Sequence, residues 1–534
     1  MADILLIQPP IRDYYLTKKR TIPYGLMSLA SGLMEKGFSV DLLDALATPK
    51  SKIIDIPSEM DYLSTYYGRT DTSPFSLFHH YRHYGYSFQH IGKIARESNA
   101  FLVGIASLFT PYADMSIQTA QTVKKILPDC TVVIGGHHPT ELPHDVLESG
   151  AVDYLIRGEG EVALPLLADA LHNGTSLENI PGLCFRKRDD TFRIVEPAMM
   201  KNLDDYPLPA AQLLNSKYYM RGDHAGYTIT ASRGCPFKCS YCAMGRSPLG
   251  TYRRRNVDRI ITEMKTAVHT YNCGFFDFED ENLTHDKKWF TALMTKIVLA
   301  FKDRDIELRA MNGLFPPSID QDLLPLMKQA GFKTLNLSLG TTSGSQLKKF
   351  NRPDVRPAFE RLTETAEMYR LACVGYIIVG APFQDPGQSV DDLIYLWRSR
   401  VLAGVSVYYP APGSADYAIC QKLNLLPEFS SLFRSSALPL DHTTNRLETV
   451  TLLRLGRIVN FIKRLADRSI PIPKPAACSR AYFSASTDRL EIGSTLLKWF
   501  LKDGIIRGVD ARGHVYTHAT AAALIEKFMN GLEF

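Results

Sequence analysis

The chain has 534 residues, enough for about two to four domains, and its 45% hydrophobic and 22% charged composition is that of an ordinary globular protein. Its 61 basic and 56 acidic residues leave a formal net charge of +5, a field too weak to indicate a nucleic-acid partner. The N-terminus lacks the pattern of a signal peptide, and no stretch reaches the roughly 18 apolar residues of a membrane span, so we expect a cytoplasmic protein.

In the first third of the chain, short apolar runs alternate with helical patterns. The predicted strands lie at 4–8, 40–43, 101–107, 131–136 and 153–158. Continuous apolar strands that alternate with helices favour a parallel sheet covered on both faces. We therefore expect a Rossmann-like domain at residues 1–200. A polar and aromatic stretch at 46–88 is expected to be an insertion or lid, and residues 201–225 a linker.

A second alternation of strands and helices follows, and we assign it to residues 226–425. Its predicted strands are 227–232, 275–280, 306–311, 334–340, 374–380 and 405–410. Six strand-helix units without a hairpin signal predict a partial (β/α)6 barrel of the TIM type, with functional residues at the carboxyl ends of its strands. The helix after the first strand is predicted from an N-cap and one apolar face: Asn256, Val257, Ile260, Ile261, Met264 and Val268. The basic run 253–255 is expected to be a solvated loop rather than an anion site.

Residues 426–534 differ from the rest and are expected to form a mostly helical C-terminal cap. Residues 442–465 have the pattern of a long amphipathic helix. Residues 504–518 resemble a hairpin that turns at 510–513.

The stretch "SRGCPFKCSYCAMG" places Cys235, Cys239 and Cys242 in a C-x3-C-x2-C pattern directly after the first barrel strand. Gly234 and Pro236 bend the chain there, so one loop can bring the thiolates around one centre. Zinc and an iron-sulfur cluster are the candidate occupants. Structural zinc needs a fourth protein ligand, and the sequence offers only the single Cys273 nearby. A four-iron cluster on three cysteines keeps one iron open, which marks a catalytic centre.

The cysteine pattern, with Tyr241 just before its third cysteine, resembles the signature of the radical SAM enzymes. The resemblance implies a [4Fe-4S] cluster on Cys235, Cys239 and Cys242, with S-adenosylmethionine (SAM) on the open iron. "FDFEDENLT" resembles the acidic segment that receives the methionine amino group, which implies Glu279 and Asp280 as contacts. The complete set of SAM contacts implied by the resemblance is Tyr241, Glu279, Asp280, Ser338, Gly340, Gly375, Ile377 and Gly380.

The N-terminal domain resembles the cobalamin-binding subset of that family, so that the match covers about residues 1–430. Ligands of open parallel sheets lie at the carboxyl ends of the strands. The implied cobalamin contacts at those ends are Pro9, Ser107, Leu108, Phe109, Thr110, Gly135, Gly136, His137, Gly158 and Glu159. The chain has no D-x-H-x-x-G motif, so we expect base-off cobalamin without a histidine ligand, shielded by a residue of 108–110.

Two other ligands are weaker candidates at this sheet. A dinucleotide site would need G-x-G-x-x-G after the first strand, where the chain has "QPPIRD". The adjacent His137 and His138 could be taken for a metal site, but no third ligand lies nearby in the sequence.

The resemblance implies that reductive cleavage of SAM gives a 5′-deoxyadenosyl radical, which takes hydrogen from an unactivated carbon of a small molecule, and that methylcobalamin delivers a methyl group. An external one-electron reductant such as flavodoxin or ferredoxin is then needed. Cyclisation, rearrangement or oxidation without methyl transfer remains an alternative, as does a corrinoid- or metal-binding protein without catalysis. The sequence identifies no residue that acts on the substrate; the segment 407–417 either faces it or forms a rigid turn.

Overall fold

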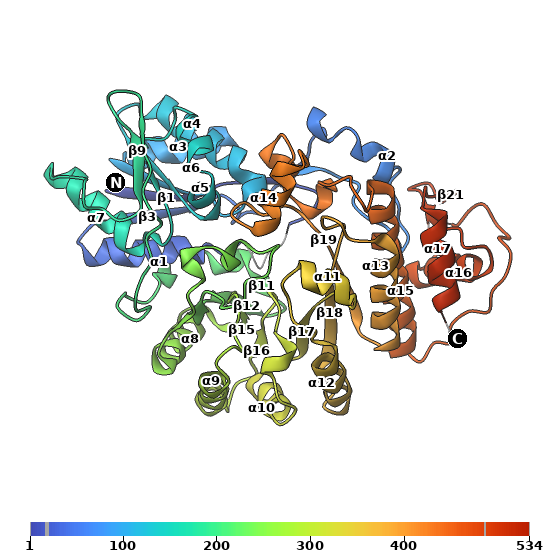
Figure 1. Cartoon of the computed structure of the whole chain (residues 1–534). Helices are drawn as coiled ribbons and strands as arrows, with labels where there is room; N and C mark the ends of the chain where they lie inside the picture. Colours follow the sequence, from blue (N-terminus) through green and yellow to red (C-terminus); the bar gives the residue numbers. More distant parts are fainter. Residues whose placement is uncertain (1, 17–20, 485–486, 533–534) are drawn as a thin grey trace.

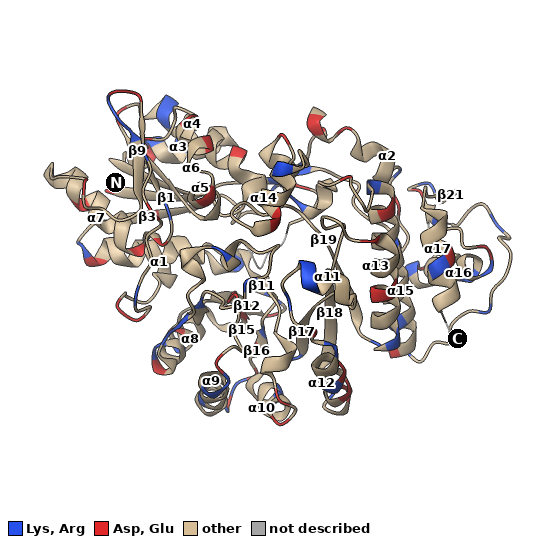
Figure 2. Ribbon diagram, viewed as in Figure 1, with Lys and Arg blue, Asp and Glu red and all other residues tan. Residues whose placement is uncertain are grey.

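The computed structural model describes residues 2–16, 21–484 and 487–532. In Figure 1 the N-terminal sheet lies above a barrel of strands and helices, and the C-terminal helices lie to the right of both. Basic and acidic segments alternate along the outer barrel helices in Figure 2, in keeping with the weak net charge. No helix in the described ranges is both long and apolar enough to cross a bilayer.

The N-terminal sheet has the strand order β10-β9-β8-β7-β6-β1-β3. Strands β3, β1, β6, β7 and β8 are parallel, and β9 and β10 continue the sheet in antiparallel fashion. Because the parallel strands follow the chain order 2-1-3-4-5, the winding reverses between β1 and β6, where open α/β sheets bind their ligands. The strands are β1 (Ile4–Gln8), β3 (Val40–Asp44), β6 (Leu102–Ala106), β7 (Thr131–Gly135), β8 (Tyr154–Ile156), β9 (Leu183–Arg186) and β10 (Phe192–Arg193).

Both faces of this sheet are covered, which explains why its strands read as unbroken apolar runs. Ile4 and Leu6 of β1 pack in the core formed with α1 and α7, whereas Leu5 and Ile7 pack in the core formed with α3 and α4. The five predicted strands and the Rossmann-like class are thereby confirmed. The helices are α1 (Tyr24–Glu35), α3 (Phe88–Ser98), α4 (Ala113–Ile126), α5 (His137–Glu141), α6 (Pro143–Leu147) and α7 (Gly160–Asn173).

The stretch between β3 and α3 packs against the C-terminal region. It contains β4 (Ser51–Ile53), α2 (Leu63–Tyr67) and β5 (Arg82–Tyr84), and β5 pairs with both β4 and β2 (Ile11–Asp13). The Asp71 carboxylate accepts from the Val509 amide at 3.1 Å and lies 3.0 Å from His518 Nε2. These buried contacts join two segments that are more than 400 positions apart.

The second domain is a partial barrel of parallel strands in the order β12-β15-β16-β17-β18-β19. Direct pairing links β12 to β15 and β16, and β17 to β18 and β19, while isolated parallel bridges at Leu308–Phe332 and Leu314–Leu337 join the two groups. Each predicted strand overlaps an observed one. They are β12 (His224–Ile229), β15 (Cys273–Phe278), β16 (Glu307–Arg309), β17 (Thr334–Gly340), β18 (Ala372–Val379) and β19 (Leu402–Val407).

The helices of the barrel lie outside its strands (Figure 1). Helix α8 (Val257–Tyr271) begins as predicted, because the Asn256 side chain accepts from the Asp258 amide and Ile260, Ile261 and Met264 are buried. The other helices of this domain are α9 (Lys287–Ala300), α10 (Leu323–Ala330), α11 (Gly344–Lys349), α12 (Arg356–Met368), α13 (Pro386–Arg398) and α14 (Ala415–Lys422).

The C-terminal region is mostly helical. Its long helix α15 (Arg446–Asp467) starts at a capping box formed by Asn445 and Glu448 and packs against β19. The predicted hairpin is present as β20 (Arg507–Val509) and β21 (Val515–Thr517), between α16 (Arg489–Asp503) and α17 (Ala522–Gly531).

Candidate functional site

The three cysteines lie in a loop whose base is a short two-stranded ribbon. Strand β13 (Ser232–Arg233) enters the loop and pairs with β14 (Arg253–Arg254), which leaves it. Gly234 has a φ of +84°, and a Cβ there would lie 2.3 Å from the Thr251 carbonyl oxygen, so only glycine fits this bend. Cys239 is buried, and Cys235 and Cys242 are partly exposed.

The cysteines are free thiols with polar groups beside them. Burial raises the pKa of Cys242 to about 11, and the neighbouring Cys239 and Cys235 add to the rise. Asn282 Nδ2 lies 3.6 Å from Cys235 Sγ, and Arg352 Nη1 lies 3.9 Å from Cys239 Sγ. Within the described ranges, no three Cys, His, Asp or Glu side chains are placed to hold a single metal ion.

The acidic segment after β15 anchors the cysteine loop. Asp280 is 2% exposed and accepts hydrogen bonds from the Ala231 amide at 3.2 Å, the Ser232 amide, and Ser232 Oγ at 2.6 Å. Burial raises the pKa of Asp280 to about 7, against the effect of these donors. Glu281 accepts from the Gly234 amide at 3.0 Å. The carboxylate predicted to meet an amino group is thus already occupied by the chain's own loop.

At the fourth barrel strand, the predicted residues Ser338 and Tyr241 lie around the guanidinium group of Arg352, which was not predicted from the sequence. Arg352 donates to the Ser338 carbonyl at 2.6 Å, to Ser338 Oγ at 3.0 Å and to the Tyr241 hydroxyl at 3.1 Å. A Cβ on Gly340, whose φ is +85°, would lie 3.1 Å from Arg352 Nε. Arg352 follows α11 in a loop with no motif, so no local signal marked it.

At the fifth strand, β18, the side-chain positions of the predicted residues face the outer helices and not the barrel interior. A Cβ on Gly375 would lie 2.4 Å from Leu396 and 3.0 Å from Phe359, both on the outer helices. Ile377 shares that face and is fully buried. Gly380 ends the strand with a φ of +77°, next to Thr449. Only backbone atoms of Gly375 and Ile377 can therefore line the interior.

The carboxyl ends of β6 and β7 form one compact edge. The Ser107 amide donates to the Gly135 carbonyl at 2.8 Å, and a Cβ on Gly136, with φ +132°, would lie 2.4 Å from the Ser107 carbonyl oxygen. Leu108 is 44% exposed. Among the described residues, Ser107 Oγ and both ring nitrogens of His138 are buried without a hydrogen-bond partner.

At the next strand end, Gly158 and Glu159 contact protein. A Cβ on Gly158 would lie 2.2 Å from the Ala198 carbonyl oxygen. The Glu159 carboxylate receives Arg253 at 2.8 and 2.9 Å and lies 3.2 Å from Arg233. Both of its oxygens are taken by arginines, so the structure gives this predicted cobalamin contact a different partner.

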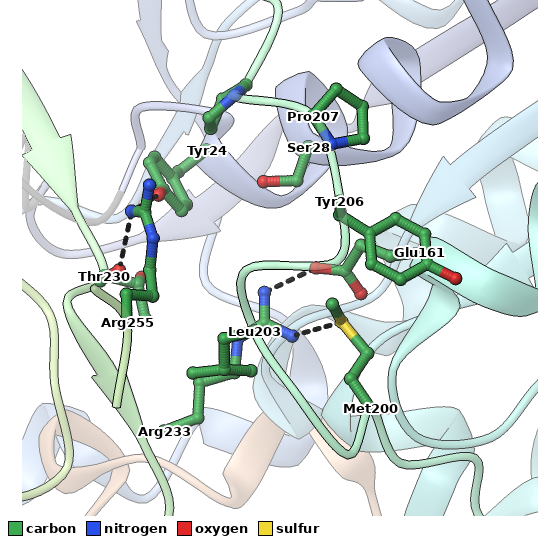
Figure 3. A pocket seen from close by; sticks show the side chains of 11 residues that line it. Tyr24, Ser28, Glu161, Met200, Leu203, Tyr206, Pro207, Thr230, Arg233 and Arg255 are labelled. Atoms are coloured by element: carbon green, nitrogen blue, oxygen red, sulfur yellow. Dashed lines mark hydrogen bonds and ion pairs between the residues drawn. The ribbon is translucent and has the colours of Figure 1, made fainter. Parts of the chain in front are cut away.

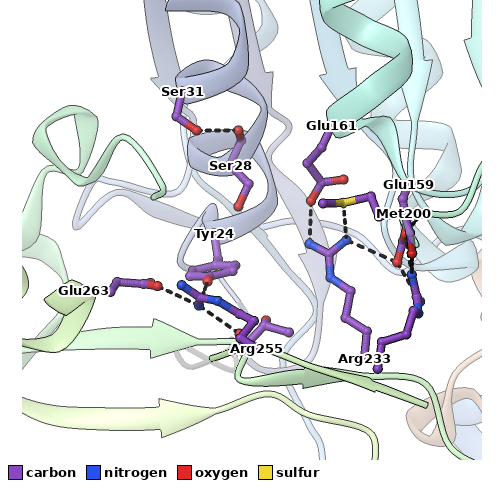
Figure 4. A network of polar contacts seen from close by, with 11 residues as sticks. Tyr24, Ser28, Ser31, Glu159, Glu161, Met200, Arg233, Arg255 and Glu263 are labelled. Carbon is purple, nitrogen blue, oxygen red and sulfur yellow. Dashed lines mark hydrogen bonds and ion pairs between the residues drawn. The ribbon is translucent and has the colours of Figure 1, made fainter. Parts of the chain in front are cut away.

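The basic run 253–255 is not a solvated loop, so that prediction was wrong. Arg255 is buried and the Arg253 side chain is 8% exposed. Arg255 pairs with Glu263 at 2.7 Å and donates to the Tyr24 hydroxyl at 3.2 Å (Figure 4). Arg254 pairs with Asp286. The sequence showed only three adjacent cations, because no local pattern marks their carboxylate partners: Glu159, the partner of Arg253, lies 94 positions away, and Glu263, the partner of Arg255, lies on the following helix.

Two cavities differ in their position: one lies beside the cysteine loop and one at the other end of the barrel. One of about 30 Å³ lies between the domains, lined by Tyr24, Glu161, Arg233 and Arg255 among others (Figure 3), and has room for ordered water only. A second, of about 510 Å³, lies at the amino ends of the barrel strands beside Phe301, Gly331 and Leu371. Neither has both the size and the position of a reaction chamber above the cysteines.

Comparisons with known proteins agree with this geometry. Residues 79–168 match the family model of the B12 binding domain, and residues 229–393 match that of the radical SAM superfamily. The chain therefore has a B12 binding domain and a radical SAM domain, the combination of the cobalamin-binding radical SAM enzymes. It binds a [4Fe-4S] cluster, SAM and cobalamin, acts on a small substrate and needs a reductant.

Two curated relatives and one solved structure illustrate the family. Cytidylyl-2-hydroxyethylphosphonate methyltransferase of Streptomyces wedmorensis is 24% identical, covering 81% of this chain and 84% of the relative. Anaerobic magnesium-protoporphyrin IX monomethyl ester cyclase of Synechocystis is 26% identical, covering 65% and 63%. The structure of the radical SAM methyltransferase TsrM from Kitasatospora setae superposes with a TM-score of 0.60 at 18% identity, covering 79% and 76%, and shares the fold.

Proposed function

We propose that the enzyme methylates an unactivated carbon of a small molecule. The observation that carries the proposal is that the edge formed by β6 and β7 and the cysteine loop face each other across the domain boundary. Arg233, at the entrance to the cysteine loop, pairs with Glu161 beyond β8, and Arg253, at its exit, pairs with Glu159 at 2.8 Å. A corrinoid at this edge and a cluster in the loop would share one chamber. Similarity to a methyltransferase over 81% of the chain supports methyl transfer.

Cys235, Cys239 and Cys242 are the proposed cluster ligands. They are free thiols in one loop, and a four-iron cluster distributes its thiolates over separate irons, so it needs a wider spacing of ligands than one metal ion. Side-chain donors at Cys235 and Cys239 fit sulfurs that carry negative charge on a cluster. The donor set therefore fits the group.

For SAM, we propose Tyr241, Glu279, Ser338, Gly340 and the backbone of β18 near Gly375, Ile377 and Gly380, and we retain Asp280 as the anchor beneath them. Buried polar atoms without a partner support a polar ligand here: Asn282 Oδ1, Asn336 Nδ2 and Arg352 Nε. A zwitterionic ligand would meet both acceptors and donors at these positions.

For cobalamin, we propose the edge made by Pro9, residues 107–110, Gly135, Gly136 and His137, with Gly158 and Glu159 supporting it from behind. The unmet Ser107 Oγ fits a ligand with many polar amides, and Gly136 lets the ends of β6 and β7 come close together beside it. We expect base-off binding without a histidine ligand, and Leu108, exposed at this edge, is the apolar side chain that we assign to the lower face.

When bound, these groups supply a 5′-deoxyadenosyl radical from SAM and a methyl group from methylcobalamin. The chain's own residues position them and exclude water. Arg434 contributes to this closure from the C-terminal region: it donates to the Arg12 and Pro111 carbonyls at 2.6 Å each and pairs with Asp13 at 3.3 Å. These bonds hold the segment that follows α14 against the N-terminal domain.

The reductant in this proposal is a flavodoxin or ferredoxin, and the compartment is the cytoplasm, in keeping with the free thiols of all the cysteines that the structure describes. A natural product, lipid or tetrapyrrole is the proposed kind of substrate. Similarity to the cyclase over 65% of the chain supports a second candidate, ring closure without methyl transfer.

The test is anaerobic reconstitution with iron, sulfide and hydroxocobalamin, followed by reduction in the presence of SAM. We expect 5′-deoxyadenosine from the intact enzyme and none from Cys239→Ala, which should still bind corrinoid. A product heavier by one methyl group supports methylation, and a product without added methyl supports the cyclase candidate. Absence of the nucleoside from a fully loaded enzyme would overturn both.

A further inference from the structure

The ribbon at the base of the cysteine loop places two arginines directly opposite each other. Arg233 of β13 is paired in register with Arg253 of β14. Their side chains are 24% and 8% exposed, so water screens their repulsion poorly. Like charges directly opposite on paired strands destabilise the pairing. The ribbon therefore requires counter-charge from elsewhere in the molecule.

That counter-charge comes from the N-terminal domain. Glu159, just after β8, lies between the two arginines and holds Arg253 through both carboxylate oxygens, and Glu161 in the first turn of α7 pairs with Arg233 (Figure 4). Two carboxylates and two guanidinium groups give a cluster with no net charge. Met200 completes it, because its carbonyl accepts from Arg253 and its amide donates to Glu159.

The four charges connect the two cofactor sites of the proposed function. Arg233 directly precedes Gly234 and Cys235, and Arg253 leaves the loop after Cys242. Glu159 and Glu161 follow β8, which pairs with β7 and its Gly135. The base of the cysteine loop is thus bonded to the same strand ends that border the corrinoid edge.

We infer that Glu159, Glu161, Arg233 and Arg253 form an interdomain charge clamp that fixes the distance between the cluster and the corrinoid. The inference rests on the proposed function for its cofactors. The clamp residues are positioning residues. Removing one carboxylate leaves a buried guanidinium uncompensated, which is far costlier than removing a whole pair, and the freed arginines then push the two ribbon strands apart.

The clamp is tested on the full chain loaded with cluster and hydroxocobalamin. Pulsed electron paramagnetic resonance measures the dipolar distance between the reduced cluster and cob(II)alamin, and hydrogen exchange follows the amides of 232–254. We expect Glu159→Gln to broaden the distance distribution and to accelerate exchange at least tenfold. The double variant Glu159→Gln with Arg253→Met should be closer to wild type than Glu159→Gln, because it removes one of the two facing cations.

Arg254→Met is the matched control. Arg254 lies in the same ribbon but pairs with Asp286 of its own domain, so this variant should keep the wild-type distance and exchange. If Glu159→Gln misfolds, Glu161→Gln replaces it and should shift the same readouts. Wild-type distance and exchange in a folded Glu159→Gln or Glu161→Gln would overturn the clamp. A wild type that takes up no corrinoid contradicts the proposed function instead, and the exchange measurement then still tests the clamp.

Discussion

Replacing Asp280 with alanine separates the two roles that the sequence and the structure give to this carboxylate. The resemblance implies a contact with the methionine amino group, whereas the structure has Asp280 accept from the Ala231 and Ser232 amides and the Ser232 hydroxyl. Because Asp280 is only 2% exposed, little water can reach the three donors that Asp280→Ala leaves without an acceptor. Each buried donor without an acceptor costs about 1–3 kcal/mol.

The assay is native-state hydrogen exchange of the protein without cofactors. Because 1.4 kcal/mol corresponds to a factor of ten, the Ala231 and Ser232 amides should exchange about 5- to 150-fold faster in Asp280→Ala. Asp280→Asn keeps one acceptor oxygen and should give a smaller change. Asp303→Ala, at an exposed carboxylate, is the control and should leave exchange unchanged. Unchanged exchange in Asp280→Ala, together with weaker SAM binding, would refute the anchor and restore the role implied by the resemblance.

Two further variants test the edge of the N-terminal sheet. Burial lowers the pKa of His138 to about 4, against an ordinary 6.5. Between pH 6.5 and 4, His138 therefore binds a proton in the unfolded chain but not in the folded one. The free energy of unfolding then falls as the pH drops below about 6.5, by about 2 kcal/mol at pH 5. Thermal melts at pH 7.5 and 5 should show this loss, and His138→Gln should reduce it; an equal loss in that variant would contradict the assignment. Gly136→Ala forces a Cβ to 2.4 Å from the Ser107 carbonyl oxygen, so we expect corrinoid uptake to fall at least tenfold while iron content stays normal. Equal uptake, measured from absorbance spectra after desalting, would show that the edge does not bind the corrinoid.

Most of the fold could be predicted from local sequence, because its signals are local. Strand β1 is apolar from Ile4 to Ile7 because both of its faces are covered, and α8 carries its own cap at Asn256. The cysteine spacing was equally local, since one loop supplies all three thiols. The predicted ends of some strands differ from the observed ends by a few residues, as at β12. Hydrogen bonding to β15, and not the apolar pattern, sets the ends of this strand.

The site beyond the cysteines depended on contacts that no window of sequence contains. Arg352 contacts Cys239 and Tyr241, which lie more than 100 positions away in the sequence. The residues next to Arg352 form no motif that would predict these contacts. The alternation of side chains along β18 was visible, but the packing of Leu396 and Phe359 decided that Gly375 faces outward.

The sequence by itself therefore determined the classes of domain, their order and the cluster loop, because apolar periodicity and ligand spacing act over a few residues. Only the tertiary structure decided what the charged residues do. Arg253 looked solvated as part of a basic run, yet it is buried against Glu159, 94 positions away. A buried charge is stable only beside its partner, and folding alone brings these two together.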